Sequence, residues 1–156
     1  MVDADAPERA SAWLPEALSR ARAALPGTPI DADSLAAFIT ERAGEVCGTE
    51  LPIEDLAWAW ALGRGDREAI LRFEREVLAG IDRVVARVDP ERSFADAVRH
   101  ELRVRVLVGD GAEPPRILSY AGRGPLEHWT LVAAIRLAYD LNRRRGDRED
   151  PVEDLD

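Results

Sequence analysis

Residues 120–146, YAGRGPLEHWTLVAAIRLAYDLNRRRG, constrain the fold most, because they carry signals for both ends of one helix. Gly124 stands at the N-cap position, Pro125 suits the first helical position, and Glu127 can reach back to the free amide groups. Arginines occupy residues 143–145, the expected last turn, where the helix dipole favours cations. The glycine that follows them is expected to end the helix in a left-handed conformation.

Helical periodicity interrupted by glycine and proline continues through the rest of the chain. It predicts further helices over residues 11–25, 31–44, 53–63, 67–88 and 94–108. Ser93 and Asp96 are spaced as a capping box for the last of these helices. Residues 103–108 also alternate with period two, as a strand would, but a helix is favoured because no partner strand is evident.

Two details of these helices predict packing. Gly80 lies inside the expected helix 67–88, where glycine costs about 1 kcal/mol relative to alanine, and this indicates a close helix crossing. Trp58 and Trp60 are two residues apart and leave their helix on different sides. One of them is expected in the core, and the other against a second element or a partner.

The composition indicates a globular protein of one domain, or of one domain with a small appendage. The chain has 156 residues, 46% of them hydrophobic, which is enough for a sizeable core. No run of eighteen apolar residues and no signal segment occurs, so a soluble cytoplasmic protein without membrane contact is expected. Cys47 is the only cysteine, which excludes an internal disulfide.

The net charge of −9 counts against a simple nucleic-acid binder, but the charge is uneven. Residues 1–50 and residues 147–156 each carry −5, whereas residues 120–146 carry +3. All 21 basic residues are arginine, which binds phosphate and carboxylate groups in bidentate fashion.

The sequence carries no signature of an enzyme, a metal site or a bound cofactor. It contains no P-loop, no dinucleotide fingerprint and no zinc-protease motif, and its two histidines are far apart. The basic helix itself has two interpretations. It is either a surface helix with an arginine-rich end, or a nucleic-acid contact in which an aromatic residue stacks on bases and arginines hold phosphates.

The order of the motifs adds a resemblance to a known family. The run GRGPLEHWTLVAAIRLAYDLNRRR resembles regions 2.3 and 2.4 of bacterial RNA polymerase sigma factors, with the pattern Trp129…A-x-R-x-A-x-D-x-x-R-R. GRGDREAILRFEREVL is similar to region 2.1, and FADAVRHELRVRVLV stands where region 2.2 is expected. The resemblance covers residues 53–146 and is closest to the divergent extracytoplasmic-function-like subgroup, including its helical N-terminal extension.

The resemblance implies an all-α fold, a sigma region-2-like helical bundle preceded by a small helical hairpin. The implied organisation is a flexible tail (1–10), an N-terminal hairpin (11–50), the region-2-like domain (53–146) and an acidic tail or linker (147–156). No helix-turn-helix like region 4 follows, so the chain is either a fragment or a one-domain relative.

The resemblance also implies a function, which is to bind core RNA polymerase and to recognise and melt the promoter minus-ten element. The implied DNA contacts are Arg123, His128, Trp129, Arg136, Arg143, Arg144 and Arg145. Trp129 is either a wedge at the melted bases or a core residue. The implied contacts with the clamp helices of the largest polymerase subunit are Asp96, Arg99, His100 and Arg103, and an anti-sigma protein is a further candidate partner. The alternative function is an acidic helical interaction or regulatory module that has the fold and binds no DNA.

Overall fold

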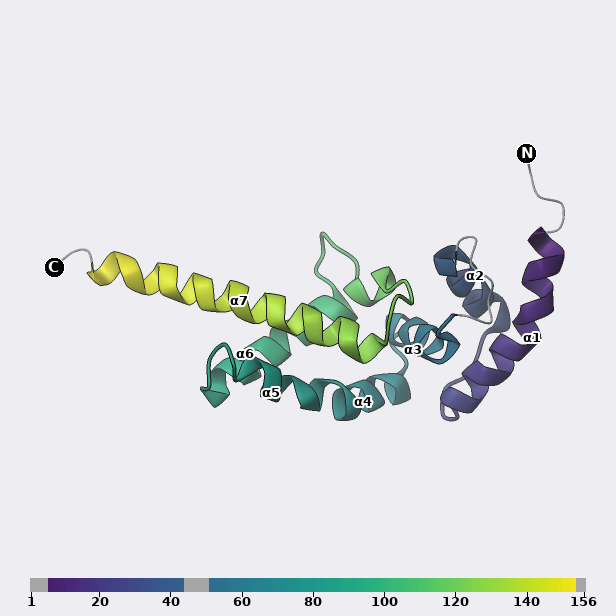
Figure 1. Ribbon diagram of the computed structural model, residues 1–156, viewed down its shortest axis with the longest axis horizontal. Coiled ribbons are helices and arrows are strands. Elements are labelled where there is room, and N and C mark those ends of the chain that lie inside the picture. Colours follow the sequence, from purple (N-terminus) through teal and green to yellow (C-terminus); the bar gives the residue numbers. More distant parts are fainter. Residues whose placement is uncertain (1–5, 44–50, 154–156) are drawn as a thin grey trace. The chain divides into compact units, whose positions relative to one another are not determined.

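The computed structural model describes the backbone of residues 6–43 and 51–153, and it confirms the all-α fold (Figure 1). No strand occurs in these two segments. Residues 104–108, for which the strand alternative stood open, form a single π-helical turn that continues from the preceding helix. None of the described helices is long and apolar enough to cross a membrane.

The chain divides into two compact units, and each is described by itself. Unit 1 comprises Met1–Leu71 and Arg116–Leu126, and unit 2 comprises Arg72–Pro115 and Glu127–Asp156. The two units are defined by compactness alone, which does not test the boundaries predicted from the sequence. The boundaries expected near residues 50 and 146 therefore stay a prediction.

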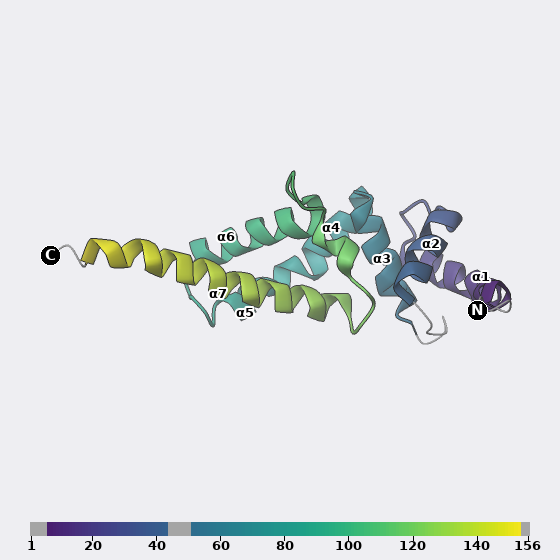
Figure 2. The ribbon, with the colours of Figure 1, turned by 90° about the horizontal axis from the view of Figure 1, so that it is seen from above.

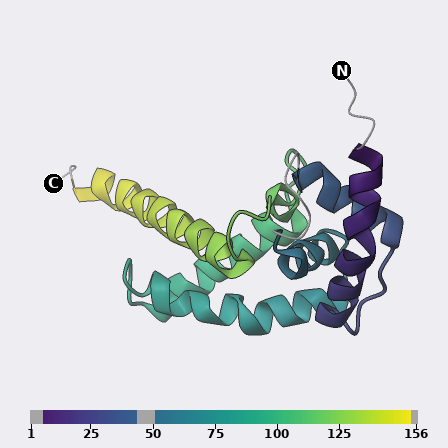
Figure 3. The same ribbon diagram turned by 45° about the vertical axis from the view of Figure 1, so that its right-hand side comes forward.

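Unit 1 is built around helix α3 (Ile53–Gly63), whose residues 56–62 are all buried. Helices α1 (Ala6–Ala24) and α2 (Ala32–Ala43) pack against α3, as does the short 3-10 helix η4 (Arg116–Ser119) (Figure 3). An apolar helix covered on several sides is expected to be hydrophobic around its whole circumference, which explains why α3 has little amphipathic pattern.

Both tryptophans of α3 are core residues that satisfy their indole N–H groups within unit 1. Trp58 donates to the carbonyl oxygen of Ala69 at 3.1 Å, and Trp60 donates to the hydroxyl of Ser34 at 3.0 Å. Their exposed fractions are 5% and 3%. The second tryptophan therefore meets another element of the same chain, which was one of the two expected outcomes.

The helix expected over residues 67–88 is interrupted. It consists of α4 (Arg67–Glu76), a 3-10 turn (Leu78–Gly80) and α5 (Ile81–Val85). The expectation of a close helix crossing at Gly80 was wrong, because a methyl group there would meet nothing within 4 Å. The glycine is exposed and ends the 3-10 turn between the two helices.

Two successive stretches of unit 2, residues 73–85 and residues 94–106, each contribute one apolar stripe to its core. Helix α6 (Arg92–Arg103) packs against α5 (Figure 1). Among the fully or nearly fully buried side chains of unit 2 are Phe73, Val77, Ile81, Val85, Phe94, Val98, Leu102 and Val106. The capping box at Ser93 was wrong, because α6 starts two residues earlier than expected, at Arg92, with Glu91 as N-cap and no side-chain cap bond.

Helix α7 (Leu126–Glu153) is one uninterrupted helix (Figures 1 and 2). The expected stop at Gly146 was wrong, because this glycine lies inside the helix and does not adopt a positive φ. One glycine costs a helix only about 1 kcal/mol, which a long helix can absorb. Residues 143–145 therefore lie in the middle of α7 and gain nothing from its C-terminal dipole.

The start of α4 supplies a stability prediction. The Asp66 carboxylate accepts the backbone N–H of Ala69 at 2.9 Å and the hydroxyl of Thr28 at 2.7 Å. Asp66→Ala removes the helix cap and leaves a largely buried hydroxyl without its acceptor, so we expect a loss of about 1–2 kcal/mol in the free energy of unfolding. Urea denaturation followed by circular dichroism measures this loss. Both hydrogen bonds end on the same carboxylate oxygen, and Asp66→Asn keeps one oxygen that can accept them, so it is the control. Equal losses in the two variants would contradict the role of Asp66 as a cap.

Candidate nucleic-acid interface

The five residues before α7 form a loop that the rest of unit 1 holds in shape. Gly122 and Gly124 have positive φ angles of 75° and 84°, conformations that favour glycine. The buried Tyr120 donates its hydroxyl hydrogen to the carbonyl oxygen of Gly124 at 2.6 Å, and burial raises the pKa of this phenol. Arg123, between the two glycines, is exposed. The loop therefore presents one arginine on a fixed backbone.

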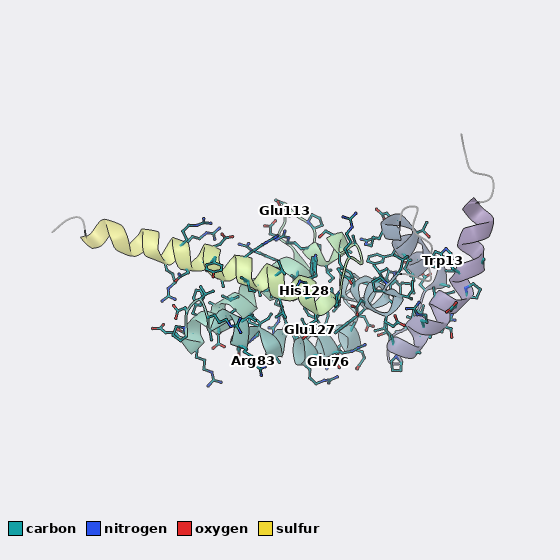
Figure 4. All side chains as sticks on the ribbon, in the orientation of Figure 1. Trp13, Glu76, Arg83, Glu113, Glu127 and His128 are labelled. Atoms are coloured by element: carbon teal, nitrogen blue, oxygen red, sulfur yellow. The ribbon has the colours of Figure 1, made fainter. Side chains whose placement is uncertain are left out.

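The first free amide of α7 is satisfied by a side chain from another helix. Leu126 donates its N–H to the Asp55 carboxylate of α3 at 2.9 Å. The helix begins one residue later than expected, directly after Pro125. Asp55 thus performs the capping that was expected of Glu127, which is exposed in the first turn beside His128 (Figure 4).

Helix α7 carries a line of candidate DNA contacts at intervals of seven residues. Trp129, Arg136 and Arg143 share one face, because seven residues make nearly two helical turns. Arg136 and Arg143 are exposed and Trp129 is half-buried, while the buried residues Ala134 and Leu137 lie on the other side. This face is the best-formed group among the predicted site residues.

Tyr139 belongs to the same face and is not among the DNA contacts predicted from the sequence. It lies three residues after Arg136 and four before Arg143, and 61% of its surface is exposed. An exposed aromatic ring flanked by arginines can stack on a base while the guanidinium groups hold phosphates. The spacing of three and four residues from Arg136 and Arg143 was a sufficient signal in the sequence.

The arginines at residues 143–145 have different surroundings. Arg143 forms an ion pair with Asp140 at 2.6 Å, and Arg144 is exposed. Arg145, whose side chain is 45% exposed, pairs with Asp89 at 3.2 Å and stands over the ring of Phe94 at 5.3 Å. The structure brings Arg143 together with Arg136 and separates Arg145 from them.

The Arg143–Asp140 pair does not remove Arg143 from consideration. Both side chains are well exposed, at 73% and 43%. Exposed pairs at this helical spacing contribute about 0.3–0.5 kcal/mol. A DNA phosphate can therefore replace the carboxylate at little cost.

The predicted polymerase contacts on α6 share one polar face, but two of them serve the fold of unit 2. Arg99 pairs with Asp82 of α5 and with Asp96 at 3.3 Å, and the hydrogen bond that Arg99 donates to Asp82 raises the pKa of Arg99. Arg103 lies 2.9 Å from Glu74 of α4, in a geometry that is not aligned for a hydrogen bond. His100 is exposed on the same face.

The described part of the structure and the comparisons with known proteins give no metal site and no relative from which a function could be inferred. Among the residues that the structure describes, no three histidine, cysteine or acidic side chains gather as a metal site. No family model, curated protein or solved structure matches the chain.

Proposed function

We propose that this chain is a sigma-factor domain that binds core RNA polymerase and helps to recognise and melt the promoter minus-ten element. The observation that carries the proposal is the exposed face of α7 with Arg136, Tyr139 and Arg143. This face lies in the segment that resembles sigma regions 2.3 and 2.4. It combines cations for the phosphate backbone with an aromatic ring for unstacked bases.

The mechanism is binding rather than covalent chemistry. Arg136 and Arg143 contact backbone phosphates, and Tyr139 offers a stacking surface for a base that leaves the duplex. Melted bases are stabilised because stacking on an aromatic side chain replaces part of the stacking lost from the duplex. Arg123, His128 and the half-buried Trp129 are further candidates for contact with the opened strand.

The net charge predicts that the polymerase supplies part of the affinity. At −9, the isolated chain repels DNA at long range, and contacts by a few arginines are weakened further by salt. Binding to core enzyme would place the arginine face against DNA that the enzyme already holds. We therefore expect weak DNA binding by the chain alone and promoter opening only in the complex.

The alternative function, an acidic interaction module without DNA binding, also has an observation in its favour. Arg99, Arg103 and Arg145 are engaged with carboxylates of unit 2. Part of the arginine content thus serves the fold. The two functions differ in one measurable property, which is whether the complex with polymerase opens DNA.

Polymerase binding is tested best at His100. Arg99 and Arg103 are poor test sites, because charge reversal there would also break the pairs with Asp82 and Glu74. His100→Glu adds a negative charge at an exposed position on the proposed contact face, and we expect about tenfold weaker binding to core polymerase. Co-purification and a binding titration with core enzyme measure the effect.

The control for this experiment is Arg83→Gln. It makes the same change of one charge unit at an exposed position of α5. This variant should bind core enzyme as the wild type does. Wild-type affinity of His100→Glu would remove this face of α6 from the proposed contact, and no association of the wild-type chain with core polymerase would contradict the proposed function.

A further inference from the structure

Arg42, near the end of α2, joins the N-terminal helices to the segment that leads into the loop before α7. Its Nε donates to the carbonyl oxygen of Tyr120 at 2.9 Å, and one terminal nitrogen donates to the carbonyl oxygen of Leu118. The other terminal nitrogen donates to the carbonyl oxygen of Phe38 at 3.1 Å, one turn back in α2. One guanidinium group thus binds main-chain oxygens of α2 and of residues 118 and 120, which lie 76 and 78 residues after Arg42 in the sequence.

The surroundings of Arg42 are unusual for a charged side chain. Only 12% of it is exposed, and its guanidinium carbon lies 3.4 Å from the centre of the Phe38 ring. Burial lowers the pKa of Arg42, and the neighbouring Glu41, 3.7 Å away and largely exposed, opposes that shift only partly. A buried cation is costly unless its donors are satisfied, and here carbonyl oxygens satisfy them.

The bonds of Arg42 continue into the loop itself. Tyr120, whose carbonyl oxygen Arg42 binds, reaches forward with its hydroxyl to Gly124. Leu56 of α3 lies against Gly122, because a methyl group there would come within 3.2 Å of its side chain. Asp55 holds the amide of Leu126 at the far end. The loop is therefore bound at its start, its middle and its end by residues of unit 1.

We propose that Arg42 is a positioning residue through which α2 holds residues 121–125 in the shape that presents Arg123 to nucleic acid. The part of this inference that concerns nucleic acid rests on the proposed function. The part that concerns the loop does not. The N-terminal helices are then a support for the loop rather than an independent appendage.

Hydrogen exchange on the full-length chain tests the part that concerns the loop. The amides of Tyr120 and Leu126 are hydrogen-bonded, to the carbonyl oxygen of Ile117 and to the Asp55 carboxylate. In Arg42→Ala both amides should exchange at least about tenfold faster, because local opening becomes easier. The amides of α3, with which Arg42 forms no hydrogen bond, should keep their wild-type rates.

Two further variants separate positioning from other roles of Arg42. Arg42→Lys keeps the positive charge at the end of α2 but lacks the planar fork that spans two carbonyl oxygens. It should accelerate the two amides nearly as much as Arg42→Ala does. Arg22→Ala removes an exposed arginine of α1 and should change nothing at the loop.

The outcomes are distinct. Unchanged exchange at Tyr120 and Leu126, wild-type rates in Arg42→Lys, or equal acceleration throughout α3 would each overturn the positioning role. Promoter opening by the complex of each variant with core polymerase is the second readout. A loosened loop with reduced opening supports the whole inference. A loosened loop with unchanged opening supports the contact of Arg42 with the loop and overturns the part that concerns nucleic acid.

Discussion

Replacement of Gly109 by alanine is expected to lower the free energy of unfolding by about 3 kcal/mol or more, one of the two largest effects that we predict. Gly109 has φ 75° and ψ 174°, a backbone region that is essentially restricted to glycine. A methyl group there would also lie 2.6 Å from the carbonyl oxygen of Glu113 and 2.8 Å from backbone atoms of Pro114 and Pro115.

Neither cost at Gly109 is easily relieved. The clashing atoms are backbone rather than flexible side chains, and the turn that follows is fixed by Asp110. The Asp110 carboxylate accepts the amides of Ala112 and Glu113 at 2.9 and 2.8 Å. The backbone around Gly109 must therefore shift. This shift disturbs the end of the π-helical turn and the buried Val106.

The control lies in the same turn. A methyl group at Gly111 would meet nothing within 4 Å, and its φ is not positive. Gly111→Ala should therefore be nearly neutral or slightly stabilising. Urea denaturation followed by circular dichroism compares the variants. An unfolding midpoint of Gly109→Ala equal to that of Gly111→Ala would contradict the local geometry on which the end of the α6 segment depends.

The second large effect concerns α7. Arg136→Ala with Arg143→Ala should weaken promoter opening by the complex with core polymerase by about 2 kcal/mol, roughly thirtyfold. The reason is that both guanidinium groups are exposed on one face and can bind phosphates together. Removal of two phosphate contacts should also reduce the slope of log affinity against log salt by about 1.5–2.

Arg145→Ala is the matched control for this pair. It changes the same residue type two positions along the helix, where the side chain instead pairs with Asp89 and covers Phe94. This variant should lose some stability and leave the salt slope unchanged. Equal slopes for the wild type and for the double variant at residues 136 and 143 would show that this face does not contact phosphates.

The fold could be predicted from the sequence where a local signal had no competitor. The apolar segment of α3 ends at Gly63 as expected, and α4 starts at Arg67 as expected. The errors arose where one residue type has several uses. Gly146 continues a helix that it was expected to stop, and Gly80 is an exposed residue of a 3-10 turn instead of part of a helix crossing.

The candidate site was predictable in its pattern but not in its partners. Intervals of seven residues placed Arg136 and Arg143 on one face, which depends only on helix geometry. Arg99 pairs with Asp82, 17 residues away, and Arg145 pairs with Asp89, 56 residues away. No spacing in the sequence predicts pairs at such separations. The contact of Arg42 with main-chain carbonyl oxygens was equally hidden, because every residue has a carbonyl group and none is marked in the sequence.

The most direct test of the central claim is the fluorescence of 2-aminopurine placed in the minus-ten element of a promoter fragment. The wild-type chain, core RNA polymerase and both together are added in turn. We predict that fluorescence rises only when both are present, because the base then unstacks, and that the double variant at residues 136 and 143 reduces this rise. A complex that forms with core polymerase and leaves the fluorescence unchanged, on every promoter that the same core enzyme opens with other sigma factors, would contradict promoter melting and favour the interaction module.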